Sequence, residues 1–163
     1  MNDASTSRSS TAVLIAGGTR DIGFACCRTF LLRGAGVVLC GTDDEGVRAA
    51  AAELEGLGGG PVAGVVCDIA DAGAVDALVA ETLRLFGRID VAVAAVGPWS
   101  PFERLPADEI DRQLAVNVRG HYNVLAACGA QMRRQGEGSI VTLGSISGVR
   151  ADCEAATYCA SKA

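Results

Sequence analysis

A tyrosine and a lysine near the end of the 163-residue chain have the spacing of an acid–base pair. Tyr158 and Lys162 lie four residues apart, so on a helix they share one face. An ammonium group beside a phenol favours the phenolate and lowers the pKa of the phenol, as general acid–base catalysis near neutral pH requires. Ser145 supplies a hydroxyl just after an apolar run. Each residue alone is typical of a solvated helix face or a loop, but their joint placement after a predicted strand, where ligands bind in doubly wound folds, indicates an acid–base site.

A glycine-rich segment near the start of the chain predicts a phosphate-binding loop. Gly17-Gly18-Thr19-Arg20-Asp21-Ile22-Gly23 follows a short apolar run and opens a helical pattern. In that position, backbone N–H groups and the positive end of the helix dipole favour a pyrophosphate. A simple tight turn between strand and helix is the alternative. The carboxylate of Asp21 would repel phosphate, so we expect this residue to be the helix N-cap, with its side chain turned away from the ligand.

Asp68 stands at the end of another apolar run. A carboxylate at the carboxyl edge of a parallel sheet can accept a hydrogen bond from an adenine amino group. Asp is equally well suited to cap the helix that follows. The spacing leaves both interpretations open.

Apolar runs alternate with helical patterns along the chain. Five strands are predicted, at Ala12–Ala16, Val37–Cys40, Val62–Val66, Val91–Val96 and Ser139–Leu143. Helices are predicted at Ile22–Arg33, Glu45–Leu57, Ala72–Phe86 and Ala107–Arg134, and a last one begins near Thr157. The pattern indicates an α/β fold: a doubly wound, Rossmann-like parallel sheet with strand order 3-2-1-4-5 and helices on both faces. Residues 1–11 are polar and predict a disordered tail, and residues 12–163 predict a single dinucleotide-binding domain.

The composition excludes several classes of protein. The formal net charge is −5 and no basic block occurs, which excludes a nucleic-acid surface. No apolar run approaches the ~20 residues of a membrane span. The single histidine, His121, gives a zinc site little support, and we expect no metal. The seven cysteines are odd in number and form no C-x-x-C pair, so a reducing cytoplasm is expected.

Together these motifs resemble the short-chain dehydrogenase/reductase family, from about Thr11 to the last residue. Gly17 and Gly23 match the glycine motif of the family, with Asp21 in place of its middle glycine. Asp68 matches the aspartate that contacts adenine. The matches to the active-site asparagine, serine, tyrosine and lysine are Asn117, Ser145, Tyr158 and Lys162.

The resemblance implies an oxidoreductase that moves a hydride between a nicotinamide cofactor and a small alcohol or ketone. In such enzymes the tyrosine gives or takes the proton and the serine holds the carbonyl oxygen. The lysine tunes the tyrosine and binds the ribose, and the asparagine orders a water in the proton relay. A homo-oligomer is also expected. The expected cofactor-binding residues are Gly17, Thr19, Arg20, Ile22, Gly23, Thr42, Asp68, Ile69, Ala94, Gly97, Tyr158 and Lys162.

NADP(H) is favoured over NAD(H) as the cofactor. An NAD site uses an acidic residue at the end of the second strand to bind the ribose 2′-hydroxyl. Gly41 and Thr42 occupy that region and Asp43 comes too late, whereas Arg20 in the glycine-rich segment can pair with a 2′-phosphate.

Two features depart from the family. Its Asn-Asn-Ala-Gly motif after the fourth strand is replaced by Ala94-Ala95-Val96-Gly97, which lacks the amide side chains that brace the strands but still allows backbone contacts to the cofactor. Family members also continue beyond the position of Ala163, with two more strands and the substrate pocket. We therefore expect an open edge on Ser139–Leu143, and we expect these 163 residues alone to be marginally stable, to associate and to show little or no turnover. The alternatives are an inactive nucleotide-binding fragment and an interaction module that uses the open edge.

Overall fold

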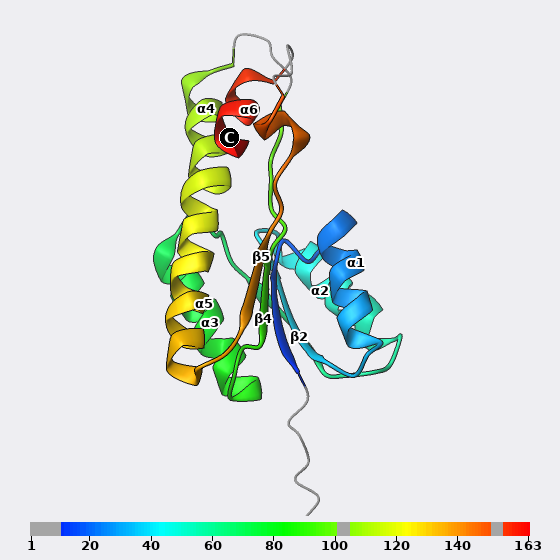
Figure 1. The fold of residues 1–163 in the computed structure, drawn as a ribbon. Coiled ribbons are helices and arrows are strands. Elements are labelled where there is room, and N and C mark those ends of the chain that lie inside the picture. The colour runs from blue at the N-terminus through cyan, green and yellow to red at the C-terminus, as the bar shows by residue number, and fades with distance from the viewer. Residues whose placement is uncertain (1–10, 101–104, 151–154) are drawn as a thin grey trace, which may run out of the picture.

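The computed structural model describes residues 11–100, 105–150 and 155–163. Residues 1–10 of the tail predicted at 1–11, together with Cys153 and part of the Pro98–Pro101 loop, therefore lie outside the described residues. A parallel sheet of five strands forms the centre, in the order β3-β2-β1-β4-β5, which confirms the predicted doubly wound α/β fold (Figure 1). The strands are β1 (Ala12–Ala16), β2 (Gly36–Gly41), β3 (Val62–Val66), β4 (Val91–Ala94) and β5 (Ser139–Thr142). The α-helices are α1 (Asp21–Leu31), α2 (Asp44–Glu55), α3 (Ala72–Phe86), α4 (Ala107–Leu114), α5 (His121–Gln135) and α6 (Ala156–Lys162).

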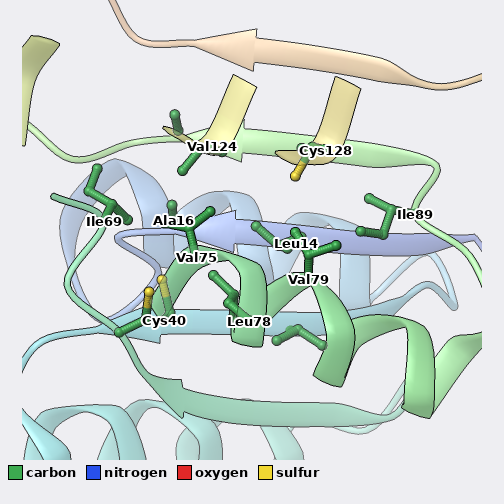
Figure 2. Packing of buried hydrophobic residues seen from close by; sticks show 14 of the residues in the cluster. Leu14, Ala16, Cys40, Ile69, Val75, Leu78, Val79, Ile89, Val124 and Cys128 are labelled. Atoms are coloured by element: carbon green, nitrogen blue, oxygen red, sulfur yellow. The ribbon is translucent and has the colours of Figure 1, made fainter. Parts of the chain in front are cut away.

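The central strand β1 separates two apolar cores. Successive side chains of a strand point to opposite faces of the sheet. Val13 and Ile15 therefore pack in the core that also holds residues of α1 and α2. Leu14 and Ala16 pack on the other face, against residues of α3 and α5, as Figure 2 shows for Val75 and Val124. Because both faces are covered, β1 is an unbroken run of buried apolar residues rather than an alternating one.

Strand β4 is shorter than predicted. The expected strand Val91–Val96 ends at Ala94, because its partner β1 ends at Ala16 and leads into the glycine-rich segment. The last bond on this side runs from the N–H of Ala95 to the carbonyl of Ala16, at 2.8 Å. Residues beyond Ala95 are therefore free to cross the carboxyl edge of the sheet.

The long helix predicted at Ala107–Arg134 is interrupted, so that prediction is wrong in its middle. A π-helical turn, η1 (Ala115–Gly120), separates α4 from α5. Gly120 lies directly against Ile69, since a Cβ at Gly120 would come within 2.7 Å of Cγ1 of Ile69. Asn117, Gly120 and His121 are all buried, and their spacing of three and four residues places them on one face of the helix. A π turn of this kind often marks a functional site.

The sheet is less covered at β5. This strand pairs with β4 and has no further strand beside it among the described residues, as expected for an open edge. The chain then passes through a short 3₁₀ helix, η2 (Ile146–Gly148), before α6 begins at Ala156, one residue before the predicted start. Within the described ranges, no helix is long and apolar enough to cross a membrane.

Candidate functional site

A cleft of about 580 Å³ lies at the carboxyl edge of the sheet, where the strand ends and the loops after them meet. It runs from the β1–α1 loop, past the ends of β2 and β3, to the segment that follows β4. Among the residues expected to bind the cofactor, those that line the cleft are Gly17, Thr19, Arg20, Ile22, Thr42, Asp68, Ile69 and Gly97. Ala94 and Gly23 lie behind this lining.

Two glycines let the β1–α1 loop close tightly. Gly17 has φ +84°, a conformation that side chains disfavour, and a Cβ there would lie 2.8 Å from Cγ2 of Val96. Gly23 has no room for any side chain, because a Cβ would overlap the carbonyl oxygen of Gly17. The N–H groups of Gly17 and Gly18 both donate to the carbonyl of Cys40, at 3.0 Å. The loop is thus fixed to β2, and the first turn of α1 faces the cleft.

Asp21 is not the N-cap that we predicted. Arg20 occupies the cap position, with extended backbone and no capping bond from its side chain, and Asp21 is the first residue of α1. The φ of Asp21 is +51°, in the left-handed region. The loop requires this conformation at this point, and Asp tolerates it better than most residues other than glycine. The exposed carboxylate lies 3.7 Å from Nε of Arg20, at the mouth of the cleft.

The structure separates the roles of two aspartates after β3. Asp71, not Asp68, caps α3: its Oδ1 accepts bonds from the N–H groups of Gly73 at 2.8 Å and Ala74 at 3.3 Å. The capping alternative for Asp68 is therefore wrong. Asp68 accepts a local bond from the N–H of Ala70 at 2.9 Å, and its exposed side chain lines the cleft.

The end of β2 presents a hydroxyl rather than an acid to the cleft. A Cβ at Gly41 would meet Cγ2 of Thr19 at 2.8 Å, so this position has no space for a carboxylate. Thr42 is exposed and lines the cleft. Asp43 also lines it, but its Oδ2 accepts from the N–H of Gly46 at 2.7 Å and so serves as the N-cap of α2.

Beside the cleft, next to Gly97, α6 brings together the candidate acid–base residues Tyr158 and Lys162, which are not themselves among the residues that line the cleft. Nζ of Lys162 lies 5.8 Å from the centre of the Tyr158 ring, as expected for residues four apart on a helix. Nζ also donates to the carbonyl of Leu143 at 3.1 Å, and burial lowers the pKa of Lys162. Ser145 is the N-cap of η2, where its Oγ accepts from the N–H of Ser147 at 3.1 Å.

Asn117 ties η1 to α6. Its Nδ2 donates to Oγ of Ser161 at 2.9 Å, and that hydroxyl donates to the carbonyl of Tyr158 at 2.8 Å. Nδ2 also lies 3.2 Å from the carbonyl of Pro98. Among the described residues, the buried Oδ1 of Asn117 has no hydrogen-bond partner.

Sequence reasoning missed several residues of the cleft. Two are thiols: Cys40 in β2 and Cys67 just after β3. A hydrogen bond between their side chains lowers the pKa of Cys67 and raises that of Cys40. Their places at strand ends could have indicated them, whereas nothing in the sequence points to the others, which are Asp43, Gly46, Ala95, Val96, Pro98, Arg112 and Val116. Among the described residues, no group of three or more His, Cys, Asp or Glu side chains is placed to hold a metal ion.

Comparison with known proteins gives a consistent result. The short chain dehydrogenase family matches residues 11–163. The chain is 35% identical to D-threitol dehydrogenase of Mycolicibacterium smegmatis over 151 residues, which cover 91% of this chain and 58% of that protein. It is similar to NAD+-bound xylitol dehydrogenase, with a TM-score of 0.87, 30% identity, and coverage of 95% of this chain and 61% of that one.

A metagenomic short-chain oxidoreductase in complex with NADP is also similar, with a TM-score of 0.85, 32% identity, and coverage of 94% of this chain and 70% of that one. The chain spans a little under three fifths of the length of its curated relative from M. smegmatis. The match with the family covers the glycine loop, the cleft and α6 alike. The chain therefore belongs to the short chain dehydrogenase family.

Proposed function

We propose that this chain binds a nicotinamide dinucleotide in the cleft and takes part in the interconversion of a hydroxyl and a carbonyl group on a small alcohol or ketone. The observation that carries the proposal is the continuity of the site. The cleft runs from the glycine loop to Gly97, and a Cβ at Gly97 would lie only 3.2 Å from Nζ of Lys162. One extended ligand can therefore reach both the phosphate loop and the acid–base residues.

The residues present fit such a cofactor. Gly17 and Gly23 leave no room for side chains between the loop and its surroundings, so backbone can approach a pyrophosphate closely. The first turn of α1 adds its positive dipole end. Asp68 would accept a bond from adenine, and Thr42 would lie near the adenosine ribose. Lys162 would hold the ribose at the nicotinamide end.

The chemistry divides between cofactor and chain. The nicotinamide, when bound, supplies or accepts the hydride. Tyr158 gives or takes the proton of the substrate oxygen, and Ser145 holds that oxygen by a hydrogen bond. The ammonium group of Lys162 lies on the same side of α6, 5.8 Å from the centre of the Tyr158 ring. Asn117 holds α6 in place through Ser161, and its Oδ1 can accept a bond from a water in the proton relay.

We further propose that the cofactor is NADP(H) rather than NAD(H). Gly41 has no room for an acid that would bind a ribose 2′-hydroxyl, and the carboxylate of Asp43 is engaged as the cap of α2. Arg20 lines the cleft with an exposed guanidinium that can pair with a 2′-phosphate. Similar structures bind NAD+ in one case and NADP in another, so the discrimination rests on these residues.

Titration of NADPH and NADH into the chain, followed by the fluorescence of the reduced nicotinamide, tests both proposals. We expect saturable binding of both, with NADPH tighter, and loss of that preference in Arg20→Ala. Tighter binding of NADH would overturn the NADP(H) proposal. Absence of binding by either cofactor would overturn the function itself and would favour an interaction module instead.

An exposed apolar stripe on α4, η1 and α5 is a candidate contact surface for the expected homo-oligomer. Exposed apolar side chains, Leu114, Val118, Tyr122 and Leu125, follow one another along α4, η1 and α5 at intervals of about one turn. Asp111 and Arg119 flank this stripe. A second copy, packed antiparallel about a twofold axis, would place acidic residues opposite basic ones. We expect Tyr122→Asp to lower the association state in sedimentation, whereas an unchanged mass would contradict this surface.

We propose the cytoplasm as the compartment of the protein. Five of the described cysteines are free thiols, which suits a reducing environment: Cys26, Cys27, Cys40, Cys67 and Cys128. Fractionation of the source cells tests the proposal, and recovery outside the cytoplasm would contradict it.

A further inference from the structure

The segment after β4 connects the two ends of the candidate site. Val96 lies against Gly17 of the glycine loop, because a Cβ on Gly17 would be 2.8 Å from Cγ2 of Val96. The next residue, Gly97, lies against Nζ of Lys162. A small displacement of this segment would therefore change both the phosphate loop and the position of the lysine.

Residues 94–97 have no polar side chain with which to fix themselves. The segment is held from outside, by two side chains one turn apart on the neighbouring helix. Asn117 donates to the carbonyl of Pro98, and Nε2 of His121 lies 2.8 Å from the carbonyl of Val96. These two carbonyls flank Gly97. Asn117 lies in η1 and His121 begins α5, and because they are four residues apart, both buried side chains share one face.

The geometry also determines which nitrogen of His121 carries the proton. A carbonyl oxygen can only accept, so Nε2 must be the protonated nitrogen and must donate. The ring is 8% exposed, and this burial, together with a smaller contribution from the charge of Lys162, lowers the pKa of His121. The neutral imidazole with its proton on Nε2 is thus the form that persists beside the lysine at neutral pH.

We propose that His121 is a positioning residue: its bond to the carbonyl of Val96 fixes the segment 95–98 and thereby sets the spacing between the glycine loop and Lys162. The inference rests on the proposed function, because the distance between the glycine loop and Lys162 matters only if one cofactor contacts both of them. His121 does not contact the reacting atoms. It acts through Val96 and Gly97, in a segment that lacks bracing amides of its own.

Two variants separate the hydrogen bond from the packing. His121→Leu removes the donor, and His121→Gln keeps an N–H donor at similar reach. On the cofactor-free chain, we expect the amide hydrogens of Val96 and Gly97 to exchange faster in His121→Leu and at nearly the original rate in His121→Gln. With NADPH present, we expect the Kd to rise about fivefold to tenfold in His121→Leu, the size of one lost hydrogen bond, and to recover in His121→Gln.

The matched control is Thr82→Val, which alters another buried polar side chain whose hydroxyl donates within α3 and away from the cleft. It should leave both measurements unchanged even if it lowers the melting temperature. If His121→Leu does not fold, His121→Asn, whose amide is too short to reach Val96, takes its place. The nitrogen-15 shifts of the imidazole in the unaltered chain test the bond directly.

The outcomes are distinct. A proton on Nδ1, or unchanged exchange at Val96 and Gly97 in His121→Leu, would overturn the positioning role. Unchanged NADPH affinity in His121→Leu, with normal binding by the unaltered chain, would overturn it as well. If the unaltered chain binds neither cofactor, the proposed function fails, and the exchange measurement alone decides whether His121 fixes the segment.

Discussion

The candidate site has a phosphate end in the cleft and a catalytic end at α6 beside the cleft, and the fold holds the first more firmly than the second. At the phosphate end, the loop leaves β1, a strand that is fully buried and paired on both sides. At the catalytic end, β5, η2 and α6 expose apolar side chains: Val141 is 48% exposed, Ile146 75% and Val149 88%. Asn117 ties α6 to η1, and Lys162 ties α6 to the carbonyl of Leu143, the residue that follows β5. Within the described residues, the fold therefore holds the phosphate end of the candidate site more firmly than the end at α6.

The largest expected effect isolates the catalytic end. In any form of the protein with measurable turnover, Tyr158→Phe should lower kcat by about 10²–10⁴-fold, because it removes the proton donor. The Kd for NADPH should stay nearly constant, since the cofactor is held mainly at the other end. Absorbance of the reduced cofactor, measured with a panel of ketones and secondary alcohols, checks this prediction. Retained turnover would show that another group moves the proton.

Amide hydrogen exchange compares the two ends without any ligand. We expect amides of α6 and β5 to open at a free energy a few kcal/mol below that of β1 and β2, because exposed elements with few buried contacts open locally. The measurement uses mass spectrometry on peptides from both regions. Equal protection of the amides in the two regions would contradict the inference that the fold holds the phosphate end more firmly than the catalytic end.

A pair of glycines tests the phosphate end. Gly17 and Gly34 both have positive φ, +84° and +81°, so alanine strains the backbone at either position by roughly 1 kcal/mol. A Cβ at Gly17 would also collide with Val96, whereas a Cβ at Gly34 meets nothing within 4 Å. We expect Gly17→Ala to weaken NADPH binding by about tenfold or more, and Gly34→Ala to leave it unchanged. Equal effects on binding would mean that strain alone, and not the cleft, explains the loss.

The pH dependence of stability reports on His121. Burial lowers its pKa in the folded chain, so below about pH 6.5 the unfolded chain binds more protons than the folded one. The free energy of unfolding should therefore fall as the pH drops below about 6.5, by at most about 1.4 kcal/mol per pH unit, and this loss should level off below the folded pKa. Because His121 is the sole histidine, urea unfolding of His121→Gln between pH 4 and pH 8 isolates its contribution. An unchanged slope in the variant would contradict the burial effect.

The sequence predicted the fold better than it predicted the local geometry of the site. Alternating apolar runs and helical patterns give strand order, and β1, β3 and α3 have the predicted bounds. The features that were predicted wrongly share a cause, because tertiary contacts rather than local sequence determine them. The end of β4 depends on where its partner β1 turns away, and the π turn depends on the contact of Gly120 with Ile69.

The same cause explains the misses in the site. Asp71 rather than Asp68 caps α3, although both residues suit the role by type and position. Spacing correctly placed Tyr158 and Lys162 together, because four residues on one helix are a local relation. His121 could not be assigned from sequence, since its partner Val96 is 25 residues away and contributes only a backbone carbonyl.

The smallest expected effect concerns Asp21, where the structure changes the sign of an expectation. As an N-cap, Asp21 would stabilise α1, and glycine would cost a few tenths of a kcal/mol. With φ +51° and no cap role, glycine instead relieves a left-handed strain, so Asp21→Gly should raise the free energy of unfolding by a few tenths of a kcal/mol. Removal of the carboxylate from the mouth of the cleft should also tighten NADPH binding by roughly twofold to fivefold, a small effect because the charge is exposed and screened.

Asp21→Ala separates the two causes, since it removes the charge but keeps a Cβ in the strained conformation. Alanine should therefore tighten binding while lowering stability, as judged by urea unfolding and cofactor titration of both variants. If Asp21→Gly weakens NADPH binding, then the carboxylate of Asp21 contributes to the site. In that case, backbone groups alone do not account for binding at the phosphate end.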